Sequence, residues 1–324
     1  MITLYQLHWS HYVEKVRWAL DYKQVEWTAV DVDPFTKQQM QHLPSKLTLD
    51  SGREMHAVPT IHDHATGAVV SDSSRILDYL ESNYPAPELY PSDPIERQET
   101  ARWTQWLDST LGLAARRLAY TQIAVEHPAI LASLFLPRSA GGGTFKARLA
   151  GAIIAGVLSR RFRFQHNRAD RVFETLEECL LIAGQRLSSR RFLVGERFTA
   201  ADLTLAALSR PVLLVPYFRD HPRLQRLWEW RTAQLQAHHR DSQVNYEAAL
   251  HDVRRRRGWA LGAVSWLGEQ CKEYPAAADI PTLPAASNDQ QSVGRWPLLM
   301  GSFWYLRLKL TCGLNRTLYR ATAA

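Results

Sequence analysis

The spacing of apolar residues predicts a β-α-β opening. Residues 3–7 and 25–32 are rich in β-branched, aromatic and other apolar side chains, so we expect a strand in each. Between them, Val13, Val16 and Leu20 recur at helical spacing. A helix that joins two successive strands implies a crossover connection, and such connections join parallel strands.

A hairpin and a second helix are predicted next. Residues 33–55 are polar and irregular, and we expect one short helix with loops there. Residues 58–61 and 68–70 are predicted strands, joined by a turn that contains Gly67. Residues 71–74 are good N-cap residues for a following helix, whose apolar face consists of Ile76, Leu77 and Leu80. The order βαβ-α-ββα is that of a thioredoxin-like domain.

After a Pro-containing linker at residues 84–87, the periodicity is helical throughout. Thr199 and Asp202 form a capping-box pattern before one of the helices. The main predicted helices span residues 94–120, 169–188, 203–208 and 221–239. The fold class is therefore α/β plus all-α, with a thioredoxin-like domain over residues 1–84. An all-helical domain covers 92–245 and contains an insertion at 121–168, and an extension covers 246–324.

Composition indicates a globular protein in a reducing compartment. Hydrophobic residues make up 46% and charged residues 22% of the 324 residues. The three cysteines are scattered without a C-x-x-C pair, which argues against a disulfide framework or a zinc site. We also find no secretory signal pattern and no apolar run long enough to cross a membrane. We therefore expect a cytoplasmic protein.

The net charge of +7 is concentrated in two segments. Residues 138–171 hold eight Lys and Arg against one acidic residue, and residues 252–324 hold ten against five. Aromatic, apolar and basic residues alternate within 296–320, a composition that suits a membrane interface. We expect a peripheral contact with anionic membrane rather than with nucleic acid, with a solvated basic face or a packed tail as the alternatives.

Three short motifs carry candidate chemistry. Ser10 precedes the first helix, where a hydroxyl and the helix N-terminus can both stabilise an anion such as a thiolate. If the Val58–Pro59 bond is cis, the backbone of Val58 can pair with a peptide ligand. Asp72 and Ser73 begin the second helix, where a carboxylate can bind an ammonium group and a hydroxyl a carboxylate.

These motifs, together with residues 11–17 and 198–202, resemble those of the cytosolic glutathione transferases. The resemblance covers residues 1–120 and 169–240 and is closest to the serine-using theta, tau and phi classes. It implies glutathione as co-substrate and no metal, a hydrophobic electrophile in the helical domain, and a homodimer. Applied residue by residue, the resemblance implies that Ser10 activates the thiol and that Val58 binds the cysteinyl backbone of glutathione. Asp72 and Ser73 would hold the γ-glutamyl group, and His56 or Arg53 would bind the glycine carboxylate.

Several alternatives remain open from the sequence. Ser10 could simply cap its helix, and Tyr5 or Tyr12 could supply the hydroxyl instead. Trp103, Trp106 and Thr110 could line the electrophile pocket, although aromatic residues at helical spacing are more often core. The insertion and the tail are also similar to those of ganglioside-induced differentiation-associated proteins. That resemblance gives the alternative of a non-catalytic scaffold or a membrane-associated binding protein.

Overall fold

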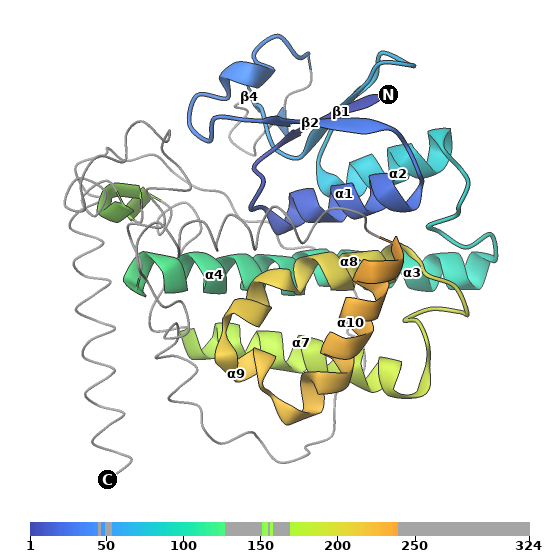
Figure 1. Ribbon diagram of the computed structural model, residues 1–324, viewed down its shortest axis with the longest axis vertical. Coiled ribbons are helices and arrows are strands. Elements are labelled where there is room, and N and C mark those ends of the chain that lie inside the picture. Colours follow the sequence, from blue (N-terminus) through green and yellow to red (C-terminus); the bar gives the residue numbers. More distant parts are fainter. Residues whose placement is uncertain (45–46, 49–53, 127–150, 155, 158–168, 239–324) are drawn as a thin grey trace.

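The computed structural model describes residues 1–44, 47–48, 54–126, 151–154, 156–157 and 169–238 (Figure 1). Most of the predicted insertion at 121–168 and all of the predicted extension at 246–324 lie outside these residues. Arg53 and the basic segment 252–324 also lie outside them. The roles expected for these segments therefore stay predictions.

The first domain is a four-stranded mixed sheet with the strand order β2-β1-β5-β6. Strand β1 (Ile2–Gln6) runs parallel to β2 (Trp27–Asp31) and antiparallel to β5 (Thr60–Asp63). Strand β6 (Val69–Ser71) closes the hairpin with β5, and Gly67 in the connecting turn has a φ of +73°, a conformation that favours glycine. The predicted order and the parallel β1–β2 pair are confirmed.

Two helices cover one face of this sheet (Figure 1). Helix α1 (His11–Tyr22) connects β1 to β2, and helix α2 (Ser73–Asn83) follows β6. Alternation along β1 places Ile2 and Leu4 against these helices, while Tyr5 packs on the opposite face. Helices α1 and α2 thus begin where strands β1 and β6 end, so that loop residues at these positions can contact a ligand.

The stretch 33–55 contains the expected short helix as a 3-10 helix, Gln38–Met40. Among its described residues it also contains two unexpected two-residue strands that pair with each other, β3 (Leu47–Thr48) and β4 (Glu54–Met55). Strands of two residues are too short to show a period-2 pattern, which explains why the sequence did not predict them.

The second domain is helical in the part that the structure describes. Helix α3 (Pro94–Leu107) continues through a π-helical turn (Asp108–Gly112) into α4 (Leu113–Glu126). The remaining helices are α7 (Ala169–Ser189), α8 (Ala200–Leu208), α9 (Pro216–Arg219) and α10 (Gln225–His238), with 3-10 turns at Arg210–Leu214 and Pro222–Leu224. The region 94–120, predicted as one helix, therefore consists of two α-helices joined by a π-helical turn.

The two domains share buried contacts. One apolar cluster joins Val16 and Trp18 of α1 to Phe198 and to Leu203 of α8. A buried Glu14 in α1 also forms an ion pair with Arg210, which follows α8. Asp202 fixes the start of α8, because its carboxylate accepts hydrogen bonds from the N–H and the hydroxyl of Thr199.

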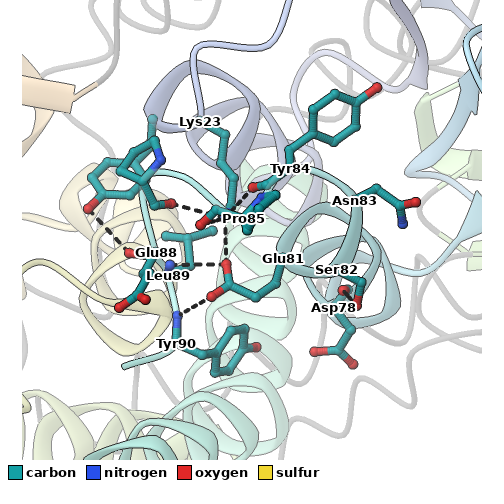
Figure 2. Close-up of polar contacts among 12 residues, drawn as sticks. Lys23, Asp78, Glu81, Ser82, Asn83, Tyr84, Pro85, Glu88, Leu89 and Tyr90 are labelled. Atoms are coloured by element: carbon teal, nitrogen blue, oxygen red, sulfur yellow. Dashed lines mark hydrogen bonds and ion pairs between the residues drawn. The ribbon is translucent and has the colours of Figure 1, made fainter. Parts of the chain in front are cut away.

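The linker between the domains is held by a buried lysine at the end of α1 (Figure 2). The ammonium group of Lys23 forms an ion pair with Glu81 of α2 and donates to the carbonyl oxygens of Tyr84 (2.8 Å) and Pro87 (3.0 Å). The same Glu81 carboxylate accepts from the backbone N–H groups of Leu89 and Tyr90, each at 3.1 Å. One ion pair therefore anchors both ends of residues 84–90.

Candidate functional site

Ser10 occupies the N-cap position of α1, but its side chain does not cap the helix. Its backbone is extended, with φ −74° and ψ 125°, and its carbonyl accepts the N–H of Glu14 at 3.0 Å. The side chain makes no capping hydrogen bond to the helix. The side chain therefore does not perform the capping role that the sequence left open as an alternative. The role of Ser10 in activating a thiol stays a prediction.

Val58 and Pro59 lie between β4 and β5, and the bond between them is cis. A cis bond was the condition under which the backbone of Val58 could pair with a peptide ligand, and this condition is met. Pro59 is buried, and its carbonyl accepts the N–H of Asp72 at 3.2 Å. This hydrogen bond places the start of α2 beside the turn that carries Val58. His56, two residues before Val58, is half-buried in the same segment.

Asp72 and Ser73 begin α2, as the sequence predicted. Asp72 is exposed and has a φ of +84°, and its carboxylate accepts the N–H groups of Ser74 (3.0 Å) and Arg75 (3.3 Å). Ser73 is buried, with 3% of its surface exposed. An exposed carboxylate next to helix N–H groups can bind an ammonium and a carboxylate of one ligand, although Asp72 also caps the helix.

A buried lysine brings the N-terminal turns of α1 and α2 together. Lys15 is fully buried, and its ammonium group binds both carboxylate oxygens of Asp108, at 2.9 and 2.7 Å. It also donates to the hydroxyl of Ser74 at 3.2 Å, and that hydroxyl donates to Asp108 at 2.6 Å. The candidate glutathione-contacting ends of both helices are thus fixed to the helical domain. No local sequence pattern indicated this role of Lys15 or Asp108.

Residues 4–88 match the family model of the glutathione S-transferase N-terminal domain, and the match includes Ser10, Val58, Pro59, Asp72 and Ser73. Residues 4–88 are thus similar to the N-terminal domain of glutathione S-transferases. The serine-using class stays a prediction.

The individual relatives of this chain are distant in sequence. A probable glutathione S-transferase of Nicotiana tabacum is 29% identical over 108 residues, which are 33% of this chain and 44% of the tobacco protein. The matched region thus spans less than half the length of that relative. Activity, substrates and partners of the whole protein are therefore matters for proposal.

Two solved structures are similar over most of the chain. The β-etherase LigF from Sphingobium sp. strain SYK-6 has 20% identity and a TM-score of 0.54, and the similarity covers 78% of this chain and 99% of that one. Glutathione transferase GSTFuA3 from Phanerochaete chrysosporium has 19% identity and a TM-score of 0.54, and covers 74% and 97% respectively. At these identities the similarity shows the fold alone. It confirms the predicted thioredoxin-like domain followed by a helical domain.

The two tyrosines considered as alternatives to Ser10 are engaged elsewhere in this transferase fold. Tyr12 is partly buried against the helical domain and donates its hydroxyl to the carbonyl of Asp108 at 3.1 Å. Burial of the hydroxyl raises the pKa of Tyr12. Tyr5 lies on the sheet face opposite α1, where its hydroxyl is 3.4 Å from Nε2 of His42. Burial raises the pKa of Tyr5 as well. Each of these two hydroxyls therefore has a protein partner of its own.

The three residues predicted to line an electrophile pocket have different environments. Trp103 is 4% exposed and belongs to the core of the helical domain, which favours the core alternative for this residue. Trp106 packs edge-on against Trp103 with ring centroids 5.6 Å apart, and is half-buried. Thr110 is also half-buried and lies in the π-helical turn. A pocket role for Trp106 and Thr110 stays a prediction.

Within the described ranges, no group of three or more His, Cys, Asp or Glu side chains is arranged to hold a metal ion. None of the helices described there combines the length and the apolar character required to span a bilayer.

Proposed function

We propose that this chain is a glutathione transferase. Glutathione binds along the first domain, with its cysteinyl backbone at Val58 and its γ-glutamyl group at Asp72 and Ser73, and His56 assists at the glycine carboxylate. The Ser10 hydroxyl donates a hydrogen bond to the sulfur. The observation that carries this proposal is the Ser10 side chain, which stands at a helix N-terminus without capping it.

The chemistry follows from the pKa of a thiol. A free thiol with a pKa near 8.5 is mostly protonated at neutral pH, so the reactive thiolate is scarce. A hydroxyl donor and a helix N-terminus both favour the anion and shift this equilibrium. The proton passes to solvent, the sulfur lone pair forms a bond to an electrophilic carbon of a hydrophobic compound, and the leaving group departs with its electron pair. Binding both reactants adds the advantage of proximity.

Calorimetric titration with glutathione tests the binding half of this proposal. Wild type is expected to bind glutathione, and Asp72→Asn to bind it roughly tenfold more weakly, because asparagine keeps the helix cap but loses the charge that pairs the ligand's ammonium. Asp93→Asn is the matched control, since Asp93 caps α3 through the N–H groups of Ile95 and Glu96 and lies outside the site. No heat of binding at millimolar glutathione in wild type would refute the proposal.

The alternative of a non-catalytic binding protein is tested by turnover. It requires that glutathione binds and that no electrophile is consumed, whereas the transferase proposal requires conjugation of a generic hydrophobic electrophile. A homodimer, a cytoplasmic location and a peripheral contact with anionic membrane stay predictions. The basic residues on which the membrane contact depends lie mostly outside the described part of the chain.

A further inference from the structure

Asp72 has a backbone conformation that its capping role does not require. Asp72 and Asp93 cap α2 and α3 in the same way, because in each the carboxylate oxygen Oδ1 accepts the N–H groups two and three residues further on. Asp93 does so with an ordinary extended backbone, φ −64° and ψ 125°, whereas Asp72 has a φ of +84°. A residue other than glycine is strained at such a φ. Capping alone therefore does not account for the conformation of Asp72.

The capping bonds of Asp72 use only half of its carboxylate. Oδ1 accepts both helix N–H groups, those of Ser74 and Arg75. Within the described part of the chain Oδ2 accepts no hydrogen bond, and Asp72 is exposed. One carboxylate can thus cap α2 through Oδ1 and bind the ammonium group of a ligand through Oδ2.

Contacts on two sides hold this strained residue in place. On one side, the N–H of Asp72 donates to the carbonyl of Pro59 at 3.2 Å. On the other side lies Ser74, whose N–H binds Oδ1 of Asp72. The hydroxyl of Ser74 donates to the Asp108 carboxylate at 2.6 Å and accepts from the Lys15 ammonium at 3.2 Å. Because strained conformations persist only where the surrounding structure holds them, these contacts fix the conformation of Asp72.

The Lys15–Asp108 ion pair is a firm anchor for the Ser74 hydroxyl. Lys15 is fully buried, and its ammonium binds the two carboxylate oxygens of Asp108 at 2.9 and 2.7 Å. Hydrogen bonds to ionised groups are stronger than those between neutral groups, and solvent screens a buried pair little. Asp108 begins the π-helical turn, so the second domain holds the start of α2 through this pair.

We propose that Ser74 and the Lys15–Asp108 pair position Asp72, so that Oδ2 of its carboxylate binds the α-ammonium group of glutathione. This inference rests on the proposed function, which places the γ-glutamyl group at Asp72. It adds three positioning residues that act through Asp72. The affinity of the first domain for the γ-glutamyl group thereby depends on Asp108, a residue of the second domain.

The test compares glutathione with deaminoglutathione, in which a hydrogen atom replaces the α-ammonium group. Ser74→Ala removes the hydroxyl and leaves the ion pair of Lys15 and Asp108 intact. In calorimetric titration this variant should bind glutathione about fivefold more weakly than wild type does, because a hydrogen bond that holds Asp72 is lost. Its affinity for deaminoglutathione should change less than about twofold, since that compound has no ammonium group for Asp72 to bind.

Two further serine variants serve as controls. Ser74→Thr keeps the hydroxyl and is expected to bind both compounds as wild type does. Ser82→Ala is the matched control, because Ser82 lies at the other end of α2 and donates its hydroxyl to the carbonyl of Asp78 within that helix. It is also expected to keep both wild-type affinities.

A double substitution separates the position of Asp72 from the stability of the fold. Lys15→Met combined with Asp108→Leu removes the ion pair without leaving an unpaired buried charge, and such replacements are often neutral or stabilising. The double variant should therefore fold. It should lose affinity for glutathione at least as much as Ser74→Ala does, while its affinity for deaminoglutathione stays within about twofold of wild type.

Two results would overturn this role of Ser74, Lys15 and Asp108. One is an unchanged affinity of Ser74→Ala for glutathione. The other is an equal loss of affinity for both compounds, which a general loosening of the site would produce. If one of the two test variants does not fold, the same criteria apply to the other. A wild type that binds neither compound refutes the proposed function itself.

Discussion

The imidazole of His11 and the carbonyl of Gly112 form a hydrogen bond of 2.9 Å across the boundary between the two domains. Because a carbonyl oxygen only accepts, Nε2 of His11 carries the proton. The next residue, Tyr12, donates to the carbonyl of Asp108 in the same π-helical turn. Two successive side chains of α1 thus satisfy backbone groups of the second domain directly beside Ser10.

Gly112 is required by the approach of Tyr12. A Cβ atom at Gly112 would collide with the hydroxyl oxygen of Tyr12 and lie 2.8 Å from its Cζ. Gly112→Ala is therefore expected to lower the free energy of unfolding by about 1–3 kcal/mol, because the ring is packed against the helical core and hydrogen-bonded. Urea denaturation measures this change.

Gly184→Ala is the matched control for that substitution. Gly184 lies in α7, and the nearest atom to a Cβ there is the Cβ of Leu227 at 4.0 Å. Alanine in an open helical position is expected to stabilise the protein by roughly 0.5–1 kcal/mol. If both substitutions changed stability equally, steric conflict at Tyr12 would not be the cause.

Loss of the Ser10 hydroxyl is expected to reduce catalysis more than binding. Ser10→Ala should lower kcat/KM with a hydrophobic electrophile by about 10²-fold, since one preorganised hydrogen bond to the reacting anion is removed. Affinity for S-methylglutathione should remain near that of wild type, because the peptide contacts are unaltered. Ser82→Ala, at the exposed end of α2, serves as the control. An undiminished rate in Ser10→Ala would remove Ser10 from the mechanism.

His11 makes stability depend on pH in the acid range. Burial lowers its pKa from 6.5 to about 3 in the folded protein, so the unfolded chain binds more protons between these values. Its contribution to stability is complete above pH 6.5 and is lost as pH falls towards 3, by up to about 1.4 kcal/mol per pH unit.

Replacement of the imidazole tests this dependence. Gln has no group that titrates in this range, and its amide can donate to the Gly112 carbonyl as His11 does. In His11→Gln the free energy of unfolding, measured by urea denaturation at several pH values, should fall less steeply below pH 6.5. His64→Gln, at an exposed turn, should keep the wild-type slope because His11 is still present. Identical slopes in wild type and His11→Gln would contradict the assignment.

The buried Lys23 is expected to be essential for the position of the linker. Lys23→Met leaves the Glu81 carboxylate without its cation and the carbonyls of Tyr84 and Pro87 without their donor. Removal of one partner of a buried ion pair costs about 3–5 kcal/mol. Thermal and urea unfolding measure the loss, and Arg75→Met, an exposed cation of α2, should change stability by less than about 0.5 kcal/mol. A small effect of Lys23→Met would show that the linker is held by other contacts.

The sequence predicted those parts of the fold and site that depend on local signals. The Thr199–Asp202 capping box, the Gly67 turn and the Asp72 N-cap each involve residues within a few positions of one another, and the structure contains all three. The sequence could not predict that the Val58–Pro59 bond is cis, because a bond that precedes proline can adopt either isomer.

Contacts between distant segments could not be predicted in the same way. The Lys15–Asp108 ion pair joins residues 93 positions apart, and nothing in a helical pattern indicates that Lys15 is buried. The apolar spacing over 94–120 did not indicate the π-helical turn, because the turn leaves this spacing nearly unchanged. Trp103 and Trp106 are one helical turn apart, yet only packing decides that the first belongs to the core.

The π-helical turn also fixes the angular phase of α4 relative to α3. Each residue added to or removed from a helix rotates everything after it by about 100°. Deletion of one residue between Asp108 and Gly112 would leave α3 in place but turn Arg116 and Tyr120 away from the segment that carries Ser10. This short turn therefore determines which residues of the second domain face the candidate thiol site. A change in the length of the turn would replace all of the α4 residues that face this site, whereas a point substitution alters only one of them.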